Sequence, residues 1–309
     1  MKIVFMGTPA AAVPSLRRIV EDGHEVVAAY TQPDRPSGRG NKIAFSPVKQ
    51  FALEHRIPVI QPTRLRTPEA IDEFKSHMAD VAVVVAYGRI LPEPFLHAFP
   101  HGAINVHFSL LPKYRGAAPV NWAIVNGEKS TGVTTMKMDA GLDTGDILLQ
   151  SEIMIGDDES SIELMDRLAI LGAEVLSETV ANLDKIEPRA QDNTAATMAP
   201  IMKKEDGRID WSMTAETILR RIRGFQPFPT TYTFLGDKRF TLWKAVSPQE
   251  MSHDVQTGSV ISANSSGIEV TCGDGTILKV TELQMEGKKR MSAADIVNGG
   301  LILTGSRFN

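Results

Sequence analysis

Val81-Ala-Val-Val-Val-Ala86 is an apolar run in which no polar residue alternates with the hydrophobic ones. A strand of this kind is typical of a parallel sheet whose two faces are both covered by helices. A half-exposed strand would instead alternate apolar and polar residues. The run therefore predicts a strand at the centre of an α/β structure.

The segments before and after this run alternate between strand and helix patterns. Val13, Leu16, Ile19 and Val20 recur at helical spacing, and Pro47 stands in a first-turn position that a helix tolerates. This β-α-β order predicts a doubly wound, mostly parallel, Rossmann-like sheet. The predicted strands are 2–6, 25–31, 59–60, 81–86 and 103–107, and the predicted helices begin near 13 and cover 46–55, 70–78 and 161–183.

The sequence changes character in its last third. Residues 187–197 are polar and show no apolar period, so they read as part of a linker. Beyond a helix predicted at 215–223, short β-rich runs separated by Gly, Asp or Asn predict a small antiparallel, OB-like β-barrel. These runs are 231–235, 239–245, 258–262, 267–271 and 275–283. We therefore expect a Rossmann-like domain over 1–189, a linker over 190–208 and a barrel domain over 209–309.

The composition is that of a soluble globular protein, with 42% hydrophobic and 23% charged residues among 309. No apolar run approaches the roughly 18–20 residues that span a bilayer, so we expect no membrane contact. The single cysteine, Cys272, excludes an intramolecular disulfide and fits the reducing cytoplasm. No long heptad or exposed apolar stripe stands out, so we expect a monomer.

The charge distribution excludes a polybasic binding domain. The net charge of −4 divides into −5 over residues 1–208 (22 Lys and Arg against 27 Asp and Glu) and +1 over 209–309 (11 against 10). Contacts with phosphate must therefore come from local clusters. One cluster follows the second predicted strand, where residues 34–49 carry four basic side chains and one acidic side chain. Glycines and prolines exclude a regular helix there, so the cluster predicts a flexible basic loop, either merely solvated or phosphate-binding.

Polar side chains that suit acyl chemistry follow the strand predicted at 103–107. Asn105 and His107 are two residues apart, so their side chains leave the same face at the carboxyl end of that strand, where open α/β sheets bind ligands. An amide can donate to a developing oxyanion, and an imidazole can exchange a proton. The acidic loop Asp139–Asp146 offers a carboxylate that could orient the imidazole.

Spacing alone leaves another interpretation of this segment open. His107 could be a hydrogen-bonded histidine at a strand end, and the acidic loop could be an ordinary turn. A metal site is less well supported, because His101 and His107 lack the paired helical spacing of zinc motifs.

Three longer motifs resemble one enzyme family. They are Met6-Gly-Thr-Pro9, the run Asn105–Pro119 (NVHFSLLPKYRGAAP) and the run Thr131–Asp146 (TGVTTMKMDAGLDTGD). Together they are similar to the 10-formyltetrahydrofolate-dependent formyltransferases, over nearly the whole chain. The resemblance implies a formyl transfer with 10-formyltetrahydrofolate as cosubstrate and without a metal.

The resemblance also implies roles for individual residues. Asn105, His107 and Asp143 match the catalytic trio of the family. Phe108 departs from the pattern, since a small residue or proline is expected beside His107. The residues implied to contact the folate are Ser109, Leu110, Leu111 and Pro112, then Arg89, Ile90 and Leu91 in the segment Tyr87–Pro92, and Ala140 in a loop that closes over the pocket.

The basic loop and the β-rich second domain are similar to the branch of the family whose acceptor is initiator methionyl-tRNA. This similarity implies that Arg39 enters the acceptor end of the tRNA, with Arg35 and Lys42 as weaker candidates. In the second domain, Lys288 and Lys289 are the implied backbone contacts, and Arg220, Arg221 and Arg223 form a second basic group.

Three other functions remain as alternatives. The acceptor could be a small amine, such as a purine precursor or a nucleotide sugar, although a purine-type enzyme needs little beyond the first domain. A nicotinamide-dependent oxidoreductase is disfavoured, because Met6-Gly-Thr-Pro9 lacks the three-glycine phosphate fingerprint. A non-catalytic tRNA-binding protein would not need Asn105, His107 and Asp143 together.

Overall fold

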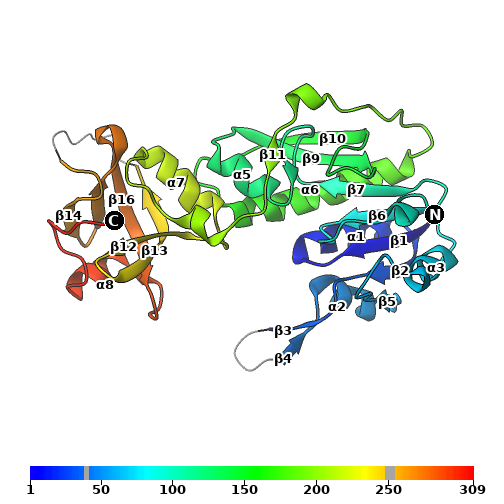
Figure 1. The fold of residues 1–309 in the computed structure, drawn as a ribbon, viewed down its shortest axis with the longest axis horizontal. Helices are drawn as coiled ribbons and strands as arrows, with labels where there is room; N and C mark the ends of the chain where they lie inside the picture. Colours follow the sequence, from blue (N-terminus) through cyan, green and yellow to red (C-terminus); the bar gives the residue numbers. More distant parts are fainter. Residues whose placement is uncertain (38–41, 248–254) are drawn as a thin grey trace. The chain divides into compact units, whose positions relative to one another are not determined.

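The computed structural model describes residues 1–37, 42–247 and 255–309, and its contacts divide the chain into two units (Figure 1). Unit 1 comprises residues 1–119, 130–154 and 165–199, and unit 2 comprises residues 120–129, 155–164 and 200–309. The domain limits expected at 189 and 209 stay a prediction.

Unit 1 is built on a seven-stranded sheet in the order β10-β9-β7-β6-β1-β2-β5. The five strands from β7 to β5 are parallel, which confirms the predicted doubly wound sheet. They are β1 (Lys2–Gly7), β2 (Glu25–Tyr30), β5 (Val59–Ile60), β6 (Val81–Val85) and β7 (Ala103–His107). The strand order reverses between β1 and β6, and such a reversal opens a ligand crevice at the carboxyl ends of the strands.

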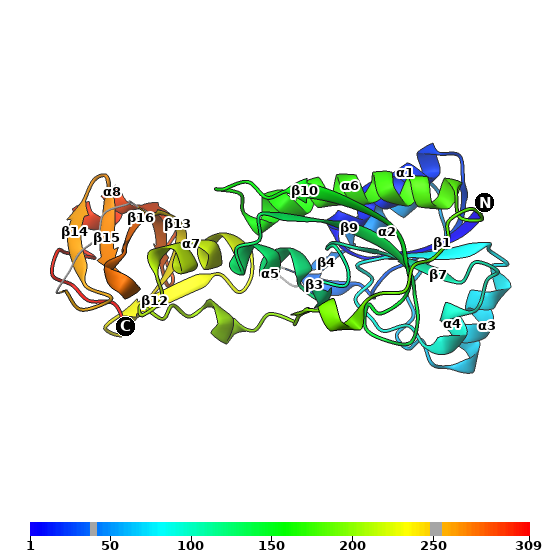
Figure 2. The same cartoon turned by 90° about the horizontal axis from the view of Figure 1, so that it is seen from above.

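Helices cover both faces of this sheet, which explains why every residue of β6 is buried. Figure 2 shows α1 and α6 on one face and α3 and α4 on the other. Phe74 and Phe95, from α3 and α4, pack against Val4 and Val84 of the sheet. The helices of unit 1 are α1 (Val13–Glu21), α2 (Pro47–Glu54), α3 (Pro68–Ser76), α4 (Glu93–Leu96) and most of α6 (Ser161–Ala181), whereas α5 (Pro119–Val125) belongs to unit 2 from Val120 on.

Two strands that the sequence analysis did not predict form the remaining edge of the sheet. β9 (Ser130–Lys137) runs antiparallel to β7, with Thr134 opposite His107, and β10 (Ile147–Met154) runs antiparallel to β9. The acidic loop Asp139–Asp146 therefore connects the two strands of a hairpin. The hairpin turns beside the amino end of β7, because Lys137 is the register partner of Ile104, and the loop reaches His107 through Asp143.

The polar segment expected to be a linker is ordered where it belongs to unit 1. It contains a short 3-10 helix, η2 (Asn193–Ala195), and β11 (Met198–Ala199), which pairs in parallel with β8 (Arg115–Gly116). A further 3-10 turn, η3 (Lys204–Gly207), follows in unit 2.

Unit 2 is an antiparallel sheet in the order β12-β13-β16-β15-β14, with β17 added to β16. The edge strands β12 and β14 both bond to the C-terminal tail, since Asn309 N–H donates to Phe234 and Val260 N–H donates to Ser306. The tail thereby closes the sheet in the manner of the predicted barrel. The elements are α7 (Ala215–Gly224), β12 (Thr231–Leu235), β13 (Lys238–Val246), β14 (Val260–Asn264), β15 (Gly267–Thr271), β16 (Ile277–Met285), β17 (Met291–Ser292) and α8 (Ala293–Asn298).

Over the described ranges, which omit 38–41 and 248–254, no helix is both long and apolar enough to cross a membrane.

Candidate active site

The alternation of β7 sends its polar and apolar side chains to opposite faces of the sheet. Asn105 is the register partner of Val84 and shares its face, and His107 follows two residues later. Val106 and Phe108 point to the other face, where Gly172 of α6 leaves room for them. A methyl group on Gly172 would lie 3.1 Å from Val106 and 3.3 Å from the Phe108 ring. Phe108 is therefore a core residue that packs away from His107.

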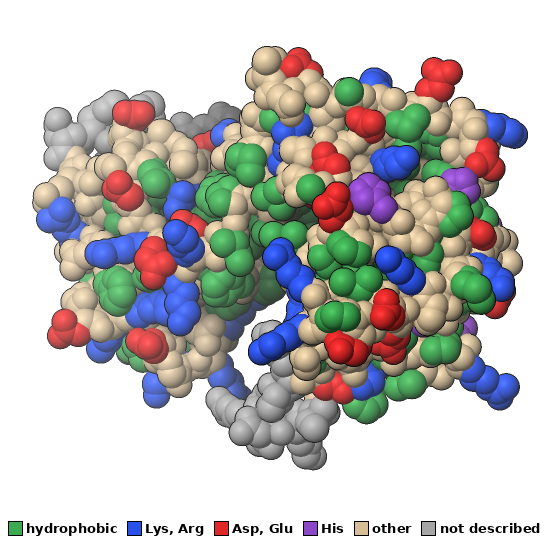
Figure 3. Space-filling model, turned by 45° about the vertical axis from the view of Figure 1, so that its right-hand side comes forward, with side chains coloured by type: hydrophobic (Ala, Val, Ile, Leu, Met, Phe, Trp, Pro, Cys, Tyr) green, Lys and Arg blue, Asp and Glu red, His purple; other side chains and the backbone are tan. Residues whose placement is uncertain are grey.

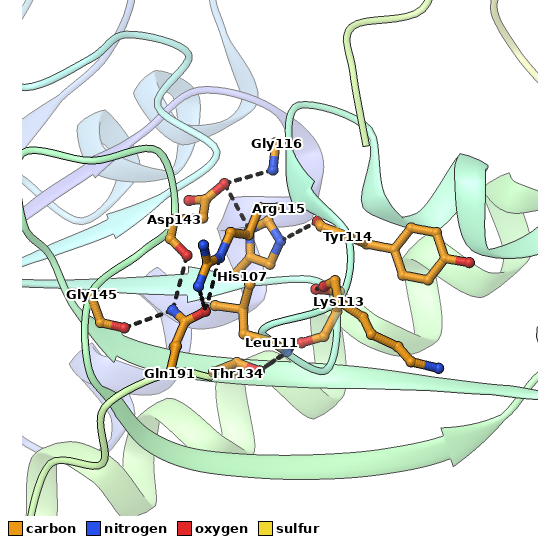
Figure 4. A network of polar contacts seen from close by, with 11 residues as sticks. His107, Leu111, Lys113, Tyr114, Arg115, Gly116, Thr134, Asp143, Gly145 and Gln191 are labelled. Atoms are coloured by element: carbon orange, nitrogen blue, oxygen red, sulfur yellow. Dashed lines mark hydrogen bonds and ion pairs between the residues drawn. The ribbon is translucent and has the colours of Figure 1, made fainter. Parts of the chain in front are cut away.

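His107 is buried, and both of its ring nitrogens face protein groups (Figure 4). Nε2 lies 2.9 Å from the carbonyl oxygen of Tyr114. A carbonyl oxygen only accepts, so Nε2 must carry the proton in this contact. Nδ1 lies 3.7 Å from Oδ2 of Asp143, which is too long for a direct hydrogen bond but close enough for an ion pair with a protonated ring.

Asp143 lies in the loop between β9 and β10 with a left-handed backbone, at a φ of 54°. Its Oδ2 accepts a hydrogen bond of 2.8 Å from the N–H of Gly116. Asp139 folds the start of the same loop, because its carboxylate accepts from the Gly141 N–H at 3.0 Å and from the Thr144 hydroxyl. The Asp143 carboxylate thus faces His107 from a loop whose conformation is held by the hydrogen bonds of Asp139.

Non-glycine residues with a positive φ gather around this end of the sheet. Ala86 follows β6 at a φ of 47°, and Tyr114 follows the Ser109–Pro112 segment at 61°. With Asp143 they make three such residues close to the strand ends. Strained backbone of this kind costs about 1–3 kcal/mol per residue and is concentrated in functional sites.

Asn105 is half-buried, and its side-chain amide has no hydrogen-bond partner in the part of the chain that the structure describes. Its neighbours in the sheet are Val84 and Met136, which offer no polar side chain. The amide is therefore available to a ligand at the carboxyl end of β7.

A buried arginine and a glutamine complete the polar network, and the sequence analysis missed the role of both. Arg115 is 6% exposed and donates through Nε and Nη2 to Oε1 of Gln191 at 3.0 and 2.8 Å. Gln191 in turn donates to the carbonyl oxygens of Asp143 and Gly145 at 2.9 and 2.7 Å (Figure 4). Arg115 lies inside the quoted motif, whereas Gln191 lies in the polar segment, where no local pattern distinguishes it.

The segment expected to contact the folate through Ser109, Leu110, Leu111 and Pro112 is firmly held. The Ser109 hydroxyl donates to the carbonyl oxygen of Lys113 at 2.7 Å, and Leu111 is 2% exposed. The side chains of Ser109 and Leu111 and the backbone N–H and C=O of Leu111 are thus committed to internal contacts, which leaves the side chains of Leu110 and Pro112 for a ligand.

The second expected folate segment, Tyr87–Pro92, follows the end of β6. Arg89 donates to the carbonyl oxygens of Pro62 and Thr63 at 3.1 and 2.9 Å, and Leu91 is buried. Ile90, by contrast, is 75% exposed. Ala140, in the loop before Asp143, is also exposed. Ile90 and Ala140 therefore present apolar surface to solvent, as a site for an aromatic ligand requires.

The expected tRNA contacts divide between a hairpin in unit 1 and a turn in unit 2. Arg35 and Lys42 lie in β3 (Arg35–Ser37) and β4 (Lys42–Ala44), which pair in an antiparallel hairpin. Arg39 falls outside the described residues. Lys288 and Lys289 lie exposed in the turn between β16 and β17.

Ion pairs already engage other members of the basic groups. Lys49 forms an ion pair with Asp34 and donates to Gln61 at 2.8 Å. These hydrogen bonds to Lys49 and Gln61 hold the pKa of Asp34 below its usual value. In unit 2, Arg220 pairs with Glu216 at 3.0 Å, and the burial of Arg221 lowers the pKa of its guanidinium. On the face in Figure 3, Lys and Arg side chains stand in small groups among acidic ones rather than as one basic surface.

The arrangement provides an amide donor, an imidazole that can lose or gain a proton at Nδ1, and a carboxylate beside that nitrogen. These groups suit a reaction that passes through a tetrahedral oxyanion and moves a proton between nitrogens.

Comparison with known proteins agrees with this chemistry. Residues 1–180 match the family model of the formyl transferases, and residues 201–301 match that of the formyl transferase C-terminal domain. The methionyl-tRNA formyltransferase of Citrifermentans bemidjiense is 51% identical over 97% of this chain and 93% of that protein. The methionyl-tRNA formyltransferase of Geobacter sulfurreducens is 48% identical over 100% of this chain and 96% of that protein.

Solved structures share the fold at lower identity. WlaRD, a sugar 3N-formyl transferase solved in the presence of dTDP and 5-N-formyl-THF, has a TM-score of 0.68 at 19% identity and covers 94% of this chain and 99% of its own. HypX from Aquifex aeolicus, solved with tetrahydrofolic acid, has a TM-score of 0.67 at 17% identity, over 99% of this chain and 48% of its own. With both family models matched and close relatives aligned over its full length, the chain belongs to the formyl transferase family.

Proposed function

We propose that this chain transfers the formyl group from N10 of 10-formyltetrahydrofolate to the α-amine of initiator methionyl-tRNA, as a monomer in the cytoplasm. The observation that carries the chemistry is the position of His107, which is held between the Tyr114 carbonyl and the Asp143 carboxylate. Asn105 lies two residues before it, and its amide has no hydrogen-bond partner among the described residues. Relatives named methionyl-tRNA formyltransferase, aligned over both units, support the acceptor.

Asn105 is assigned to the oxygen of the formyl group. Attack by a neutral amine on the formyl carbon turns that oxygen into an oxyanion in a tetrahedral intermediate. The side-chain amide of Asn105 donates a hydrogen bond that strengthens as the charge develops. One donor of this kind is typically responsible for about 10²–10³ in rate.

His107 and Asp143 are assigned to the proton movements. Because Nε2 is bonded to Tyr114, Nδ1 is the nitrogen that exchanges a proton. The Asp143 carboxylate, 3.7 Å away, stabilises the protonated ring. The proton lost by the attacking amine is taken up at this pair and delivered to the leaving N10, so the intermediate collapses to the N-formyl product and tetrahydrofolate.

The folate is assigned to the surface formed by Ser109–Pro112, Arg89–Leu91 and Ala140. In this proposal Ile90 and Ala140 supply apolar contacts to the ring system. The two hydrogen bonds from Arg89 to the carbonyl oxygens of Pro62 and Thr63 restrain the segment that carries Ile90.

The tRNA is assigned to the basic hairpin and to the turn between β16 and β17. Arg39, Arg35 and Lys42 are proposed to meet the acceptor end, and Lys288 and Lys289 the phosphate backbone. Lys49 and Asp34 cancel each other's charge in their ion pair. The net positive charge of residues 34–49 therefore comes from Arg35, Arg39 and Lys42. Binding through so few phosphate contacts should weaken steeply with salt.

The proposal is tested by formyl transfer from one folate donor to methionyl-tRNA, compared with free methionine and with an amino sugar nucleotide. Wild-type protein is expected to use methionyl-tRNA at a kcat/KM far above that for either small amine. Arg39→Ala should raise the KM for tRNA, whereas His107→Ala should lower kcat with every acceptor. Arg66→Ala, which removes an exposed arginine before α3, is the matched control and should match wild type. A preference of the wild-type protein for a small amine would overturn the acceptor assignment.

A further inference from the structure

We call residues Arg189–Ala199 the crossing segment. Its backbone forms hydrogen bonds with two parts of unit 1 that contact His107, the Asp143 loop and the segment that contains Tyr114 and β8. At its start, Arg189 and Ile147 exchange two backbone hydrogen bonds of 2.8 and 2.9 Å at the end of the Asp143 loop. At its end, β11 pairs with β8. Gly116 of β8 permits this pairing, because a Cβ there would lie 2.5 Å from the carbonyl oxygen of Ala199.

We infer that Gln191 and Thr197 of this segment are positioning residues for the transfer reaction, Gln191 for Asp143 and Thr197 for His107. The inference rests on the proposed function for its rate measurements. It assigns a catalytic consequence to a stretch whose sequence has the properties of a linker.

Gln191 uses the full bonding capacity of its amide. Nε2 donates its two hydrogens to the carbonyl oxygens of Asp143 and Gly145, and Oε1 accepts twice from Arg115. Because a guanidinium only donates, Arg115 forces Oε1 toward itself and the NH₂ group toward the loop. Arg115 therefore fixes the orientation in which Gln191 can hold the loop.

Both the side-chain carboxylate and the backbone carbonyl of Asp143 are consequently held, and the two contacts depend on neighbouring residues of β8, Gly116 and Arg115. The Gly116 N–H binds its carboxylate at 2.8 Å, and the side chain of Arg115 acts through Gln191 on its carbonyl oxygen. The left-handed backbone of Asp143 needs such support, since a non-glycine residue in that conformation stores strain. Without Gln191 the loop would lose two of the hydrogen bonds that oppose its relaxation.

Thr197 acts on His107 through one intermediate residue. Its hydroxyl accepts a hydrogen bond of 2.9 Å from the N–H of Tyr114, and the carbonyl oxygen of the same Tyr114 accepts from His107 Nε2 at 2.9 Å. Tyr114 also has a left-handed backbone, at a φ of 61°. The Thr197 hydroxyl therefore helps to fix Tyr114, the residue whose carbonyl oxygen orients the imidazole.

Displacement of either side chain should reduce the rate of the chemical step rather than substrate binding. A shift of about 1 Å in a reacting group can cost about 10²-fold in rate. Substitutions at Gln191 or Thr197 should accordingly lower kcat by about 10–100-fold and leave the KM values for folate and tRNA within about threefold.

The decisive comparison is Gln191→Glu against Asn193→Asp. Glu at 191 still accepts from Arg115 but turns an oxygen toward the carbonyls of Asp143 and Gly145, so the contact with the loop becomes repulsive. Asn193 accepts from the same Arg115 at 2.9 Å but bonds to neither loop carbonyl. Asn193→Asp therefore adds the same charge beside Arg115 without disturbing the loop, and its kcat should match wild type. Equal losses in the two variants would overturn the role of Gln191.

Thr197 is tested by Thr197→Val and its conservative counterpart Thr197→Ser. Valine keeps the shape but removes the acceptor for Tyr114, and kcat should fall, while serine restores the acceptor and should restore kcat. Thr194→Val, whose hydroxyl bonds to Asp192 within the segment, is the matched control. Failure of serine to restore kcat would overturn the assignment.

Amide hydrogen exchange separates this inference from the proposed function. Gln191→Glu should increase exchange in residues 139–146, and Asn193→Asp should not, whichever acceptor the enzyme uses. Absence of transfer to methionyl-tRNA by wild-type protein would overturn the proposed function alone. Unchanged exchange together with a wild-type kcat in Gln191→Glu would overturn the positioning role alone.

Discussion

His107 donates from Nε2 to the carbonyl oxygen of Tyr114 at 2.9 Å, and this contact determines which ring nitrogen can take part in the reaction. Since the carbonyl only accepts, Nε2 keeps its proton as long as this contact is made. Nδ1 is then the nitrogen that changes, and it faces Asp143 at 3.7 Å. In the proposed reaction the proton would therefore pass on the side of His107 that faces the acidic loop.

Replacement of His107 should abolish most of the transfer with every amine acceptor. His107→Ala removes the proton carrier and leaves the buried carbonyl of Tyr114 without its donor, which costs about 1–3 kcal/mol of unfolding free energy. Single-turnover formyl transfer should fall by at least about 10²-fold. Thermal unfolding measured in parallel shows whether the variant is folded at the assay temperature. Turnover near that of wild type in folded His107→Ala would refute the role given to the ring.

Asn105→Ala should lose activity without losing stability. The Asn105 amide has no hydrogen-bond partner among the described residues, so its removal leaves no bonded group unsatisfied. The oxyanion, in contrast, loses a donor, and kcat should fall by about 10²–10³-fold. Steady-state kinetics and urea unfolding on one preparation test both halves. A fall in stability with an unchanged kcat would show that Asn105 serves the fold instead.

Asp143→Asn and Asp143→Ala should differ in stability but agree in activity. Asparagine keeps an oxygen for the Gly116 N–H and tolerates the left-handed backbone, whereas alanine at a φ of 54° adds strain of about 1–2 kcal/mol. Both variants remove the negative charge beside Nδ1, so both should lose most of kcat. The comparison requires kcat and denaturant midpoints for the pair. Full activity in Asp143→Asn would exclude an electrostatic role for the carboxylate.

The hairpin of the basic loop should become less stable in acid. Hydrogen bonds from Lys49 and Gln61 lower the pKa of Asp34, so the pair stabilises the fold above the unfolded pKa of about 3.9. That contribution is lost as the pH falls through the lower folded pKa. The Tm of Asp34→Asn should therefore lie below that of wild type at pH 7, and the gap should close below about pH 4. A gap that stays constant with pH would mean that the charge of Asp34 contributes nothing.

Local sequence patterns were sufficient to predict the parallel strands of the unit 1 sheet and to predict that Asn105 and His107 share one face. The apolar run at Val81–Val85 could only be a strand covered on both sides, and a period of two places residues 105 and 107 together. The same period explains Phe108: one step along the strand turns it toward Gly172.

The parts that were not predicted depend on contacts between distant segments. β9 and β10 lie on either side of the acidic loop, and neither has the continuous apolar run of β6, since β9 is rich in Ser and Thr and β10 has Gln150, Ser151 and Glu152 at its centre. Gln191 reaches Asp143 across 48 residues, and Arg115 reaches Gln191 across 76. Nothing in the polar sequence around Gln191 indicates which side chain points inward. That orientation depends on the hydrogen bonds from the Arg115 guanidinium, which form only when the chain has folded.

The crossing segment also sets an order of events during synthesis. All seven strands of the unit 1 sheet have been made once Met154 is added, but the partners of Asp143 and Tyr114 arrive only with residues 191–197. A growing polypeptide therefore passes through a stage in which all strands of this sheet have been made and the carbonyl oxygen of Asp143 still lacks its donor Gln191. The hydrogen bonds that hold the Asp143 loop and Tyr114 are therefore completed only by residues made after α6.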